Sequence, residues 1–355
     1  LLLLVAIRPA AAVDVGTVVT AENVDTVAAL LLPGEVDAVR RGLRIEVAAP
    51  RRVLWRRAYK EATEKNAGQT RLGPRGELLG YVAGLPFLDI DPKDPQVADK
   101  IIWNHACGPW RVDDARAWSF QWQTGRLGAA GPMRVESGEQ EDAEQSKWIR
   151  LVGRTEVPPL PAFPDNAGDV LDMEIFGPTL PVFRTVLRSG PLLTYRYRGL
   201  KEDAVWYWTS WDQKTRRIPP EIRYESFGDV VIDLNSSFGL NVPHGSYTWK
   251  LLGEQRMLGV LHGRHYPAEW CPARGDFAPC EAWEERTVYL VEGTAVQSYD
   301  SYSKRVVAID KEGWVVLATD LFDKQGKRWK TWMNFWSYRP DARRGADAEE
   351  VAYLL

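Results

Sequence analysis

The chain's histidines come first, because imidazole is the commonest metal ligand and general base in proteins. His262 and His265 are spaced as H-x-x-H, whereas His105 and His244 stand alone. Such a pair can bind a metal ion, but on a strand or a turn the two rings would not share a face. We therefore expect these histidines to form ordinary hydrogen bonds, and we predict no metal site.

Acidic residues form two further patterns. The run from Asp89 to Asp94 suggests calcium, but an EF-hand loop needs Gly and Glu where this chain has Asp94 and Lys100. We expect Asp-Pro turns instead, with Asp94 capping the next helix. The paired carboxylates Glu284-Glu285 and Asp113-Asp114 would point to opposite faces of a strand, which is poor geometry for shared acid–base work.

Common catalytic signatures are missing from the sequence. It contains no G-x-S-x-G, no G-x-x-x-x-G-K-[ST], no H-E-x-x-H and no G-x-G-x-x-G. We predict a protein that is not an enzyme, with no catalytic residues and no cofactor. A hydrolase built from dispersed residues stays open as an alternative, because a triad is recognised by its geometry and not by its order.

Cysteine chemistry indicates export. Cys271 and Cys280 flank a short loop that contains Pro and Gly. In an oxidising compartment we expect them to form a disulfide, which would stabilise the fold by about 2–3 kcal/mol in the chain-entropy model. Metal binding is the alternative, but no further Cys or close His pair completes a tetrahedral set. Cys107 is left over and is expected to be a buried thiol.

The first residues also indicate export. Leu1–Ile7 is an apolar run, and Ala10-Ala11-Ala12 follows it. This pattern is typical of the end of a signal peptide and its cleavage site. The run is too short to span a bilayer, and no later segment approaches the required length. We expect residues 1–12 to be a signal-peptide remnant on an exported protein.

The composition narrows the class of partner. The 355 residues include 45% apolar and 26% charged residues, the balance of a soluble globular protein. A net charge of −3 and a pI near 6.0 argue against nucleic-acid binding, which favours a basic excess. The 16 Trp residues suit broad sheets and half-open cavities. They form either an ordinary sheet core or, in part, the walls of a ligand site.

Short helical patterns occupy the N-terminal region. Thr20 can cap a helix that carries Val24, Val27 and Leu31 on one face. The other elements expected here are a helix over 35–41, a strand over 44–48, a helix over 56–66 and a helix from Pro95 to about His105.

From about residue 115 onward the hydrophobic period changes to two, which predicts strands. The expected strands cover 117–122, 148–152, 192–198, 204–211, 286–292, 304–310, 314–322 and 328–336. Tight turns at 310–313 and 323–326 predict an antiparallel meander at the end. The acidic stretch Gly138–Gln145 is interpreted as a solvated loop.

Alternation along two of these strands gathers aromatic residues. Leu193, Tyr195 and Tyr197 share one face, and Trp206 and Trp208 share another. Aromatics on the strands are the candidates for the walls of a ligand cavity, although the sequence does not tell which strand face is concave. The candidates are Tyr195, Tyr197, Trp206, Trp208, Trp249, Trp332 and Trp336.

A family resemblance extends from about residue 15 to residue 340. The stretches that carry it in the N-terminal third are Tyr59–Lys65, Gly68–Leu72, Tyr81–Phe87, Ile90–Pro92 and Lys100–Asn104. Tyr302–Val306 and Ile309–Lys311 strengthen it near the end of the chain. With these motifs the sequence resembles the bacterial family called domain of unknown function 1329, which is grouped with the LolA/LolB-like proteins. The region 228–282 resembles the family poorly.

This resemblance implies a mainly β (α+β) fold, a strongly curved antiparallel sheet or half-barrel with helices packed on its concave side. The expected layout is N-terminal helical segments over 13–110 and the half-barrel over 111–340, together one structural domain over 13–340, with a C-terminal tail over 341–355. LolA and LolB carry lipoprotein acyl chains in such a cavity, and family members often accompany RND-type exporters. No catalytic residues are established for the family.

We therefore expect a periplasmic binding or carrier protein for a lipid or another hydrophobic molecule. We expect this protein to serve an export or outer-membrane pathway and to be able to associate peripherally with the outer membrane. The alternative is a structural or adaptor protein of an RND-type export system or of the outer membrane. Exposed Trp residues would also allow the protein to bind sugar rings, which stack on indole rings.

Overall fold

The computed structural model describes residues 13–126, 134–166, 169–177, 191–209, 212–226, 231–265, 268–271, 278–340 and 350–354. The signal-peptide remnant expected over 1–12, and most of the tail expected over 341–355, lie outside these ranges.

Helices are few and short. The α-helices are α1 (Pro33–Arg40), α2 (Arg57–Lys65) and α3 (Val97–Ala106). The 3₁₀ helices are η1 (Val24–Thr26), η2 (Ala28–Leu30), η3 (Pro220–Tyr224), η4 (Ser237–Gly239) and η5 (His244–Ser246). The prediction of α2 is confirmed. The single helix expected after Thr20 is wrong, because that segment forms two 3₁₀ turns; its apolar residues are nevertheless buried.

Strands make up most of the regular structure. The strands of the first half are β1 (Val18–Val19), β2 (Ile45–Ala48), β3 (Arg71–Leu72), β4 (Leu78–Leu79), β5 (Asp114–Arg126), β6 (Arg134–Arg150) and β7 (Val170–Phe176). Those of the second half are β8 (Leu192–Tyr197), β9 (Ala204–Thr209), β10 (Lys214–Arg217), β11 (Tyr247–Gly259), β12 (Ala282–Ala295), β13 (Lys304–Asp310), β14 (Val316–Phe322), β15 (Arg328–Met333), β16 (Trp336–Pro340) and β17 (Glu350–Leu354).

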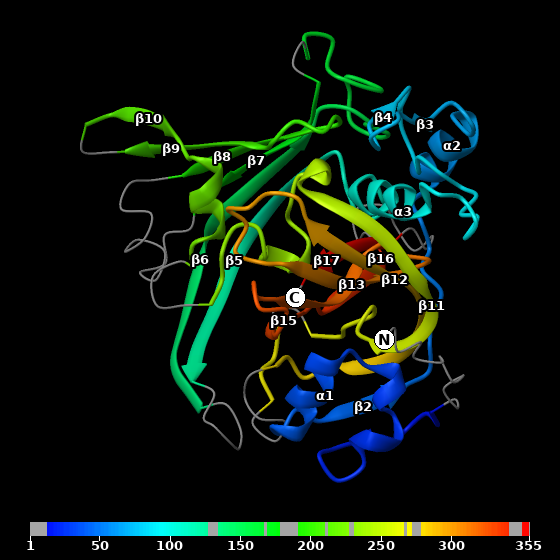
Figure 1. Ribbon diagram of the computed structural model, residues 1–355, viewed down its shortest axis with the longest axis vertical. Helices are drawn as coiled ribbons and strands as arrows, with labels where there is room; N and C mark the ends of the chain where they lie inside the picture. Colours follow the sequence, from blue (N-terminus) through cyan, green and yellow to red (C-terminus); the bar gives the residue numbers. More distant parts are fainter. Residues whose placement is uncertain are drawn as a thin grey trace.

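One sheet has six strands in the order β10-β9-β8-β7-β6-β5, and every neighbouring pair is antiparallel. Figure 1 shows β5 and β6 as two long strands that run side by side from the upper centre to the lower left of the view. The loop expected over Gly138–Gln145 is a wrong prediction, because these residues belong to β6 and pair with β5. Hydrogen bonding along this hairpin overrides their loop-like composition.

A second sheet has seven strands, in the order β1-β2-β12-β13-β14-β15 with β11 beside β12. Its strands β12 to β15 pair sequentially and antiparallel, which confirms the predicted meander. β2 joins β12 in a parallel pairing. β11 bends through a wide arc (Figure 1), and its register shifts between Leu251 and Gly253. Such a bulge increases the local bend and twist of a strand.

Helix α3 lies between the two sheets. Its residues Ile101 and Ile102 pack on Val291 and Val307 of the seven-stranded sheet. Trp103 belongs to a different apolar cluster, which includes Leu171 of β7. A helix with apolar residues around most of its circumference is a buried helix. The position of α3 therefore defines the space that remains between the sheets.

The predicted fold class is confirmed: the protein is mainly β, with curved antiparallel sheets and helices packed against them. Instead of being gathered in one sheet, the described strands are divided among two large sheets and the two-stranded pairs β3-β4 and β16-β17. Residues 350–354, expected in the C-terminal tail, form β17 and pair with β16. Among the described residues, no helix combines the length and apolar character needed to cross a membrane.

Candidate functional site

One face of the six-stranded sheet carries apolar and aromatic residues on four neighbouring strands. The pairing aligns Ile149, Met173 and Tyr195 in one cross-strand row. A second row runs through Ile175, Leu193 and Trp206. Directly paired side chains lie on the same face of a sheet. We call the surface made by these residues and Trp208 the aromatic face.

None of the side chains of the aromatic face is fully buried. Trp208 is 40% exposed and Ile175 is 36% exposed. The rings of Tyr195 and Trp206 meet edge to face, with centroids 5.2 Å apart. The second row continues to Lys147 on β6 at one end and to Arg217 on β10 at the other. The result is a partly exposed apolar surface with basic residues at both ends of one row.

Three of the predicted cavity residues, Tyr195, Trp206 and Trp208, come together on this face. The predicted alternation on β8 and β9 is therefore what places them side by side. Tyr197 stands at the end of β8 and lines a cleft instead. The register of β8 against β9 brings these residues from two separate sequence segments into one surface.

The remaining three predicted residues lie elsewhere. Trp336 on β16 is only 4% exposed and packs in the core beside Trp110. Trp249 on β11 is half-buried, and its indole N–H donates to the carbonyl of His244, 3.1 Å away. The Trp332 indole on β15 donates to Asn334. The seven candidates thus divide among an exposed face, a cleft, the core and the second sheet.

The opposite face of the same sheet, which we call the charged face, carries charged residues beside the buried apolar residues Leu192 and Val205. Arg196 donates to Asp172 at 3.2 Å, to Glu174 at 3.1 Å and to Asn241 at 2.6 Å. Asp172 is almost fully buried. A buried carboxylate needs such partners because desolvation penalises its charge. This charged face, and not the aromatic face, is turned toward α3.

A cleft of about 60 Å³ lies between this charged face, α3 and residues 240–244. On the same measure one water needs about 10–15 Å³, so the cleft holds a few waters or one small polar group. Its walls include the charged residues Arg111, Asp172, Arg196 and Asp203. The sequence predicted an apolar hollow between sheet and helices, and that expectation is not met at this cleft.

Two histidines line the cleft. The Nδ1 atom of His105 lies 2.8 Å from the carbonyl oxygen of Trp314, so it donates there. Burial, with a smaller contribution from the nearby Arg111 cation, lowers the pKa of His105 to about 3, so the ring is neutral. His244 stacks on Trp103, and its Nε2 atom lies 2.8 Å from Asp99. The Nδ1 atom of His244 is buried and has no hydrogen-bond partner among the residues that the structure describes.

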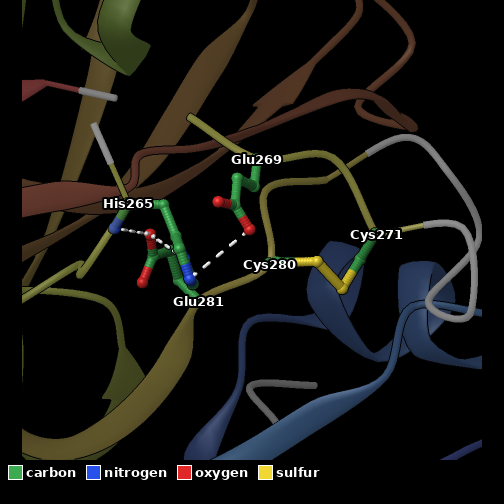
Figure 2. The surroundings of a disulfide bond; sticks show 5 residues. All are labelled: His265, Glu269, Cys271, Cys280 and Glu281. Carbon is green, nitrogen blue, oxygen red and sulfur yellow. Dashed lines mark hydrogen bonds and ion pairs between the residues drawn. A yellow bond between two sulfur atoms is a disulfide. The ribbon is translucent and has the colours of Figure 1, made fainter. Parts of the chain in front are cut away.

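The predicted disulfide between Cys271 and Cys280 is confirmed, and Cys107 is a buried free thiol as expected. Figure 2 shows the disulfide and, beside it, the ring of His265 between two glutamates. Its Nδ1 atom lies 3.1 Å from Glu281, and its Nε2 atom lies 3.6 Å from Glu269. The residues between Cys271 and Ala278 lie outside the described ranges.

The other motif residues form ordinary contacts. The Nδ1 atom of His262 lies 2.6 Å from Glu284, so the two histidines of the H-x-x-H pair contact different carboxylates. No group of three His, Cys, Asp or Glu residues within the described part of the chain is arranged to hold a metal ion. Asp94 accepts the Gln96 amide just before α3, which begins at Val97 and not at Pro95.

Sequence reasoning missed Arg111 and Trp148. Neither belongs to a motif, and they are brought together only when β6 packs beside the segment that follows α3. The guanidinium carbon of Arg111 lies 3.6 Å from the centre of the Trp148 ring and 3.9 Å from that of Trp110. A cation over aromatic faces is attracted by the ring quadrupoles.

The family model "Protein of unknown function (DUF1329)" matches residues 18–355. The chain therefore belongs to this family, as its motifs indicated. A search of curated proteins found no match.

Three solved structures are similar in shape. An outer membrane lipoprotein-sorting protein domain from Vibrio parahaemolyticus has 13% identity and a TM-score of 0.44, over 72% of this chain and 81% of that one. A DUF1329 family protein from Desulfovibrio piger has 16% identity and a TM-score of 0.36, over 62% and 70%. A LolA superfamily protein from Nitrosomonas europaea has 10% identity and a TM-score of 0.31, over 67% and 74%. The family membership follows from the family model and not from these similarities.

Proposed function

We propose that this protein binds a lipid or another hydrophobic molecule on its aromatic face and carries it through the periplasm. The observation that supports the proposal is the partly exposed aromatic face itself. In an ordinary two-layer protein the face turned away from the core is polar. Here the face toward α3 carries the charged residues Asp172 and Arg196 beside buried apolar residues, whereas the other face carries apolar and aromatic residues that are partly exposed.

The energetics suit an acyl chain or a similar molecule. Burying one CH₂ group yields about 0.8 kcal/mol, so a long chain gains affinity without any polar contact. Aromatic rings such as those of Tyr195 and Trp206 offer large apolar area at a low cost in conformational entropy. Contiguous exposed apolar surface of this kind marks interaction sites on soluble proteins. A carrier also needs no reactive groups, in agreement with the missing catalytic signatures.

The proposed compartment is the periplasm, with peripheral association at the outer membrane. The Cys271–Cys280 disulfide supports an oxidising environment, and the apolar start of the sequence supports export. An RND-type exporter is the partner that the family resemblance implies, and we include it in the proposal as the donor or acceptor of the cargo.

Native mass spectrometry of protein purified from the periplasm without detergent tests the function. The proposal expects a bound lipid-like mass that is released on denaturation. The double variant Trp206→Ser/Trp208→Ser removes apolar area from the aromatic face. We expect it to bind a fluorescent fatty acid at least tenfold more weakly than the wild type.

Trp329→Ser is the matched control, because Trp329 is 51% exposed on β15 of the other sheet. Its binding should equal that of the wild type. A ligand-free mass, together with equal behaviour of all three proteins, would refute the carrier function. If a pull-down then captures an export component through the aromatic face, the protein is an adaptor.

A further inference from the structure

The side chain of Arg111 is partly buried and has unmet hydrogen-bonding capacity within the described part of the chain. Its Nε and Nη1 atoms are buried and have no acceptor among the described residues. The neighbouring carboxylates Asp172 and Glu174 are already engaged by Arg196. A guanidinium stays protonated at physiological pH. Its N–H groups therefore remain donors that need acceptors. In Arg111, two of these N–H groups are removed from water without a hydrogen bond in the described part of the chain.

A second unpaired donor belongs to the same stack. The indole N–H of Trp148, whose ring centre lies 3.6 Å from the Arg111 guanidinium carbon, is buried and also lacks an acceptor in the described ranges. Indole is a donor only, so no rotation of the ring or change of tautomer can satisfy it from within. Arg111 and Trp148 therefore offer three buried N–H donors, Arg111 Nε and Nη1 and Trp148 Nε1, that have no acceptor among the described residues.

Arg111 also lines the 60 Å³ cleft, and His244 lines it too. A planar guanidinium with parallel N–H groups matches the geometry of a carboxylate or a phosphate. A cleft that holds a few waters has room for such a group but not for a long hydrocarbon chain.

We propose that the cleft at Arg111 binds an oxyanion, a carboxylate or a phosphate group, which accepts hydrogen bonds from the Arg111 guanidinium. The bound group is either a free small anion or the head group of an amphiphile. This site lies on the opposite face of the six-stranded sheet from the aromatic face, so it does not depend on the proposed carrier function.

Isothermal titration calorimetry and thermal unfolding test the site, with sodium phosphate, sodium acetate and sodium octanoate as probes and NaCl at equal ionic strength as the blank. We expect at least one probe to bind the wild type and to raise its unfolding temperature. Arg111→Gln should weaken that binding at least tenfold, and Arg111→Lys should weaken it less. Arg198→Gln should bind like the wild type, because Arg198 follows β8 and forms a partly exposed ion pair with Asp169.

The probes distinguish the sources of the oxyanion. Binding of phosphate or acetate indicates a free anion, whereas binding of octanoate alone indicates the head group of an amphiphile. If Arg111→Gln does not fold, ¹⁵N NMR of the wild type replaces it. The Arg111 Nε–H signal, assigned by its loss in Arg111→Lys, must then shift when the anion probes are titrated in. Equal binding by wild type and Arg111→Gln, or no response of the wild type to any probe, overturns the proposal. Trp206→Ser should leave this binding unchanged even if lipid binding is lost.

Discussion

Trp336 lies edge-on to Trp110, with ring centroids 5.4 Å apart, and its indole N–H donates to the carbonyl of Val316 at 2.8 Å. Both its ring and its N–H are therefore satisfied inside the core. We expect Trp336→Ala to destabilise the protein by about 3–5 kcal/mol, because it leaves a large cavity. Trp208→Ala, at a 40% exposed position, should cost less than about 1 kcal/mol. Urea unfolding of both variants measures the difference, and similar losses would contradict it.

Gly84 adopts a φ of +85° and is closely approached by the backbone of α2. A Cβ atom there would lie 2.4 Å from the backbone nitrogen of Thr63. Gly16 has a similar φ of +88° but nothing within 4 Å of its Cβ position. Gly16→Ala should therefore cost about 1–2 kcal/mol from backbone strain alone. Gly84→Ala should cost at least about 2 kcal/mol more, and equal melting temperatures of the two variants would show that the contact is unimportant.

Glu35 is a buried carboxyl group in α1, and its Oε2 atom accepts the amide of Leu32 at 2.7 Å. Burial raises its pKa to about 8, with a smaller upward contribution from Asp320. The folded state therefore holds a proton that the unfolded state releases near pH 4.5. The free energy of unfolding should fall as the pH rises from about 4.5 to about 8.

Glu35→Gln should flatten this decline by at least about 1 kcal/mol, because the amide does not titrate. Chemical unfolding at several pH values measures the slope. A slope of the same sign should remain, since burial also raises the pKa of Asp320. The exposed Glu22→Gln variant is the control and should follow the wild type. An unchanged slope in Glu35→Gln would disprove the role of this carboxyl group.

The Cys271–Cys280 disulfide closes a short loop, with a sequence separation of 9 residues. Reducing it should lower the free energy of unfolding by about 2–3 kcal/mol, because the unfolded chain regains conformational freedom. Unfolding with and without reductant measures this loss. The Cys271→Ala/Cys280→Ala variant should match the reduced wild type and should not respond to reductant; a response there would point to another thiol.

Local sequence patterns were sufficient for several elements and insufficient for the site. Alternation on β8 and β9 correctly predicted that Tyr195 shares a face with Leu193, because a strand has a strict period of two. Which face is exposed depends on what packs against the sheet, and this is decided by α3, far away in sequence. The contact between Arg111 and Trp148 could not be predicted either, because it also depends on tertiary packing. Arg111 lies in a loop, and Trp148 lies in β6, for which the sequence predicted only a short strand from residue 148.

Composition misled the interpretation of β6. The acidic stretch Gly138–Gln145 has the residues of a loop, and only its pairing with β5 makes it a strand. Conversely, Trp336 and Trp206 look alike in sequence, since each sits in an alternating aromatic segment. Their environments differ because β16 packs into the core, whereas β9 lies next to the edge strand β10.

Tyr195 and Arg196 are consecutive residues of β8 whose side chains belong to opposite faces of the sheet. A single layer of backbone therefore separates the aromatic face from the charged cleft. If an occupant of either side displaces β8, the other side moves with it. Thermodynamic reciprocity then requires each occupant to change the affinity of the other by the same factor. Strand β8 would then couple binding at the aromatic face to binding in the charged cleft.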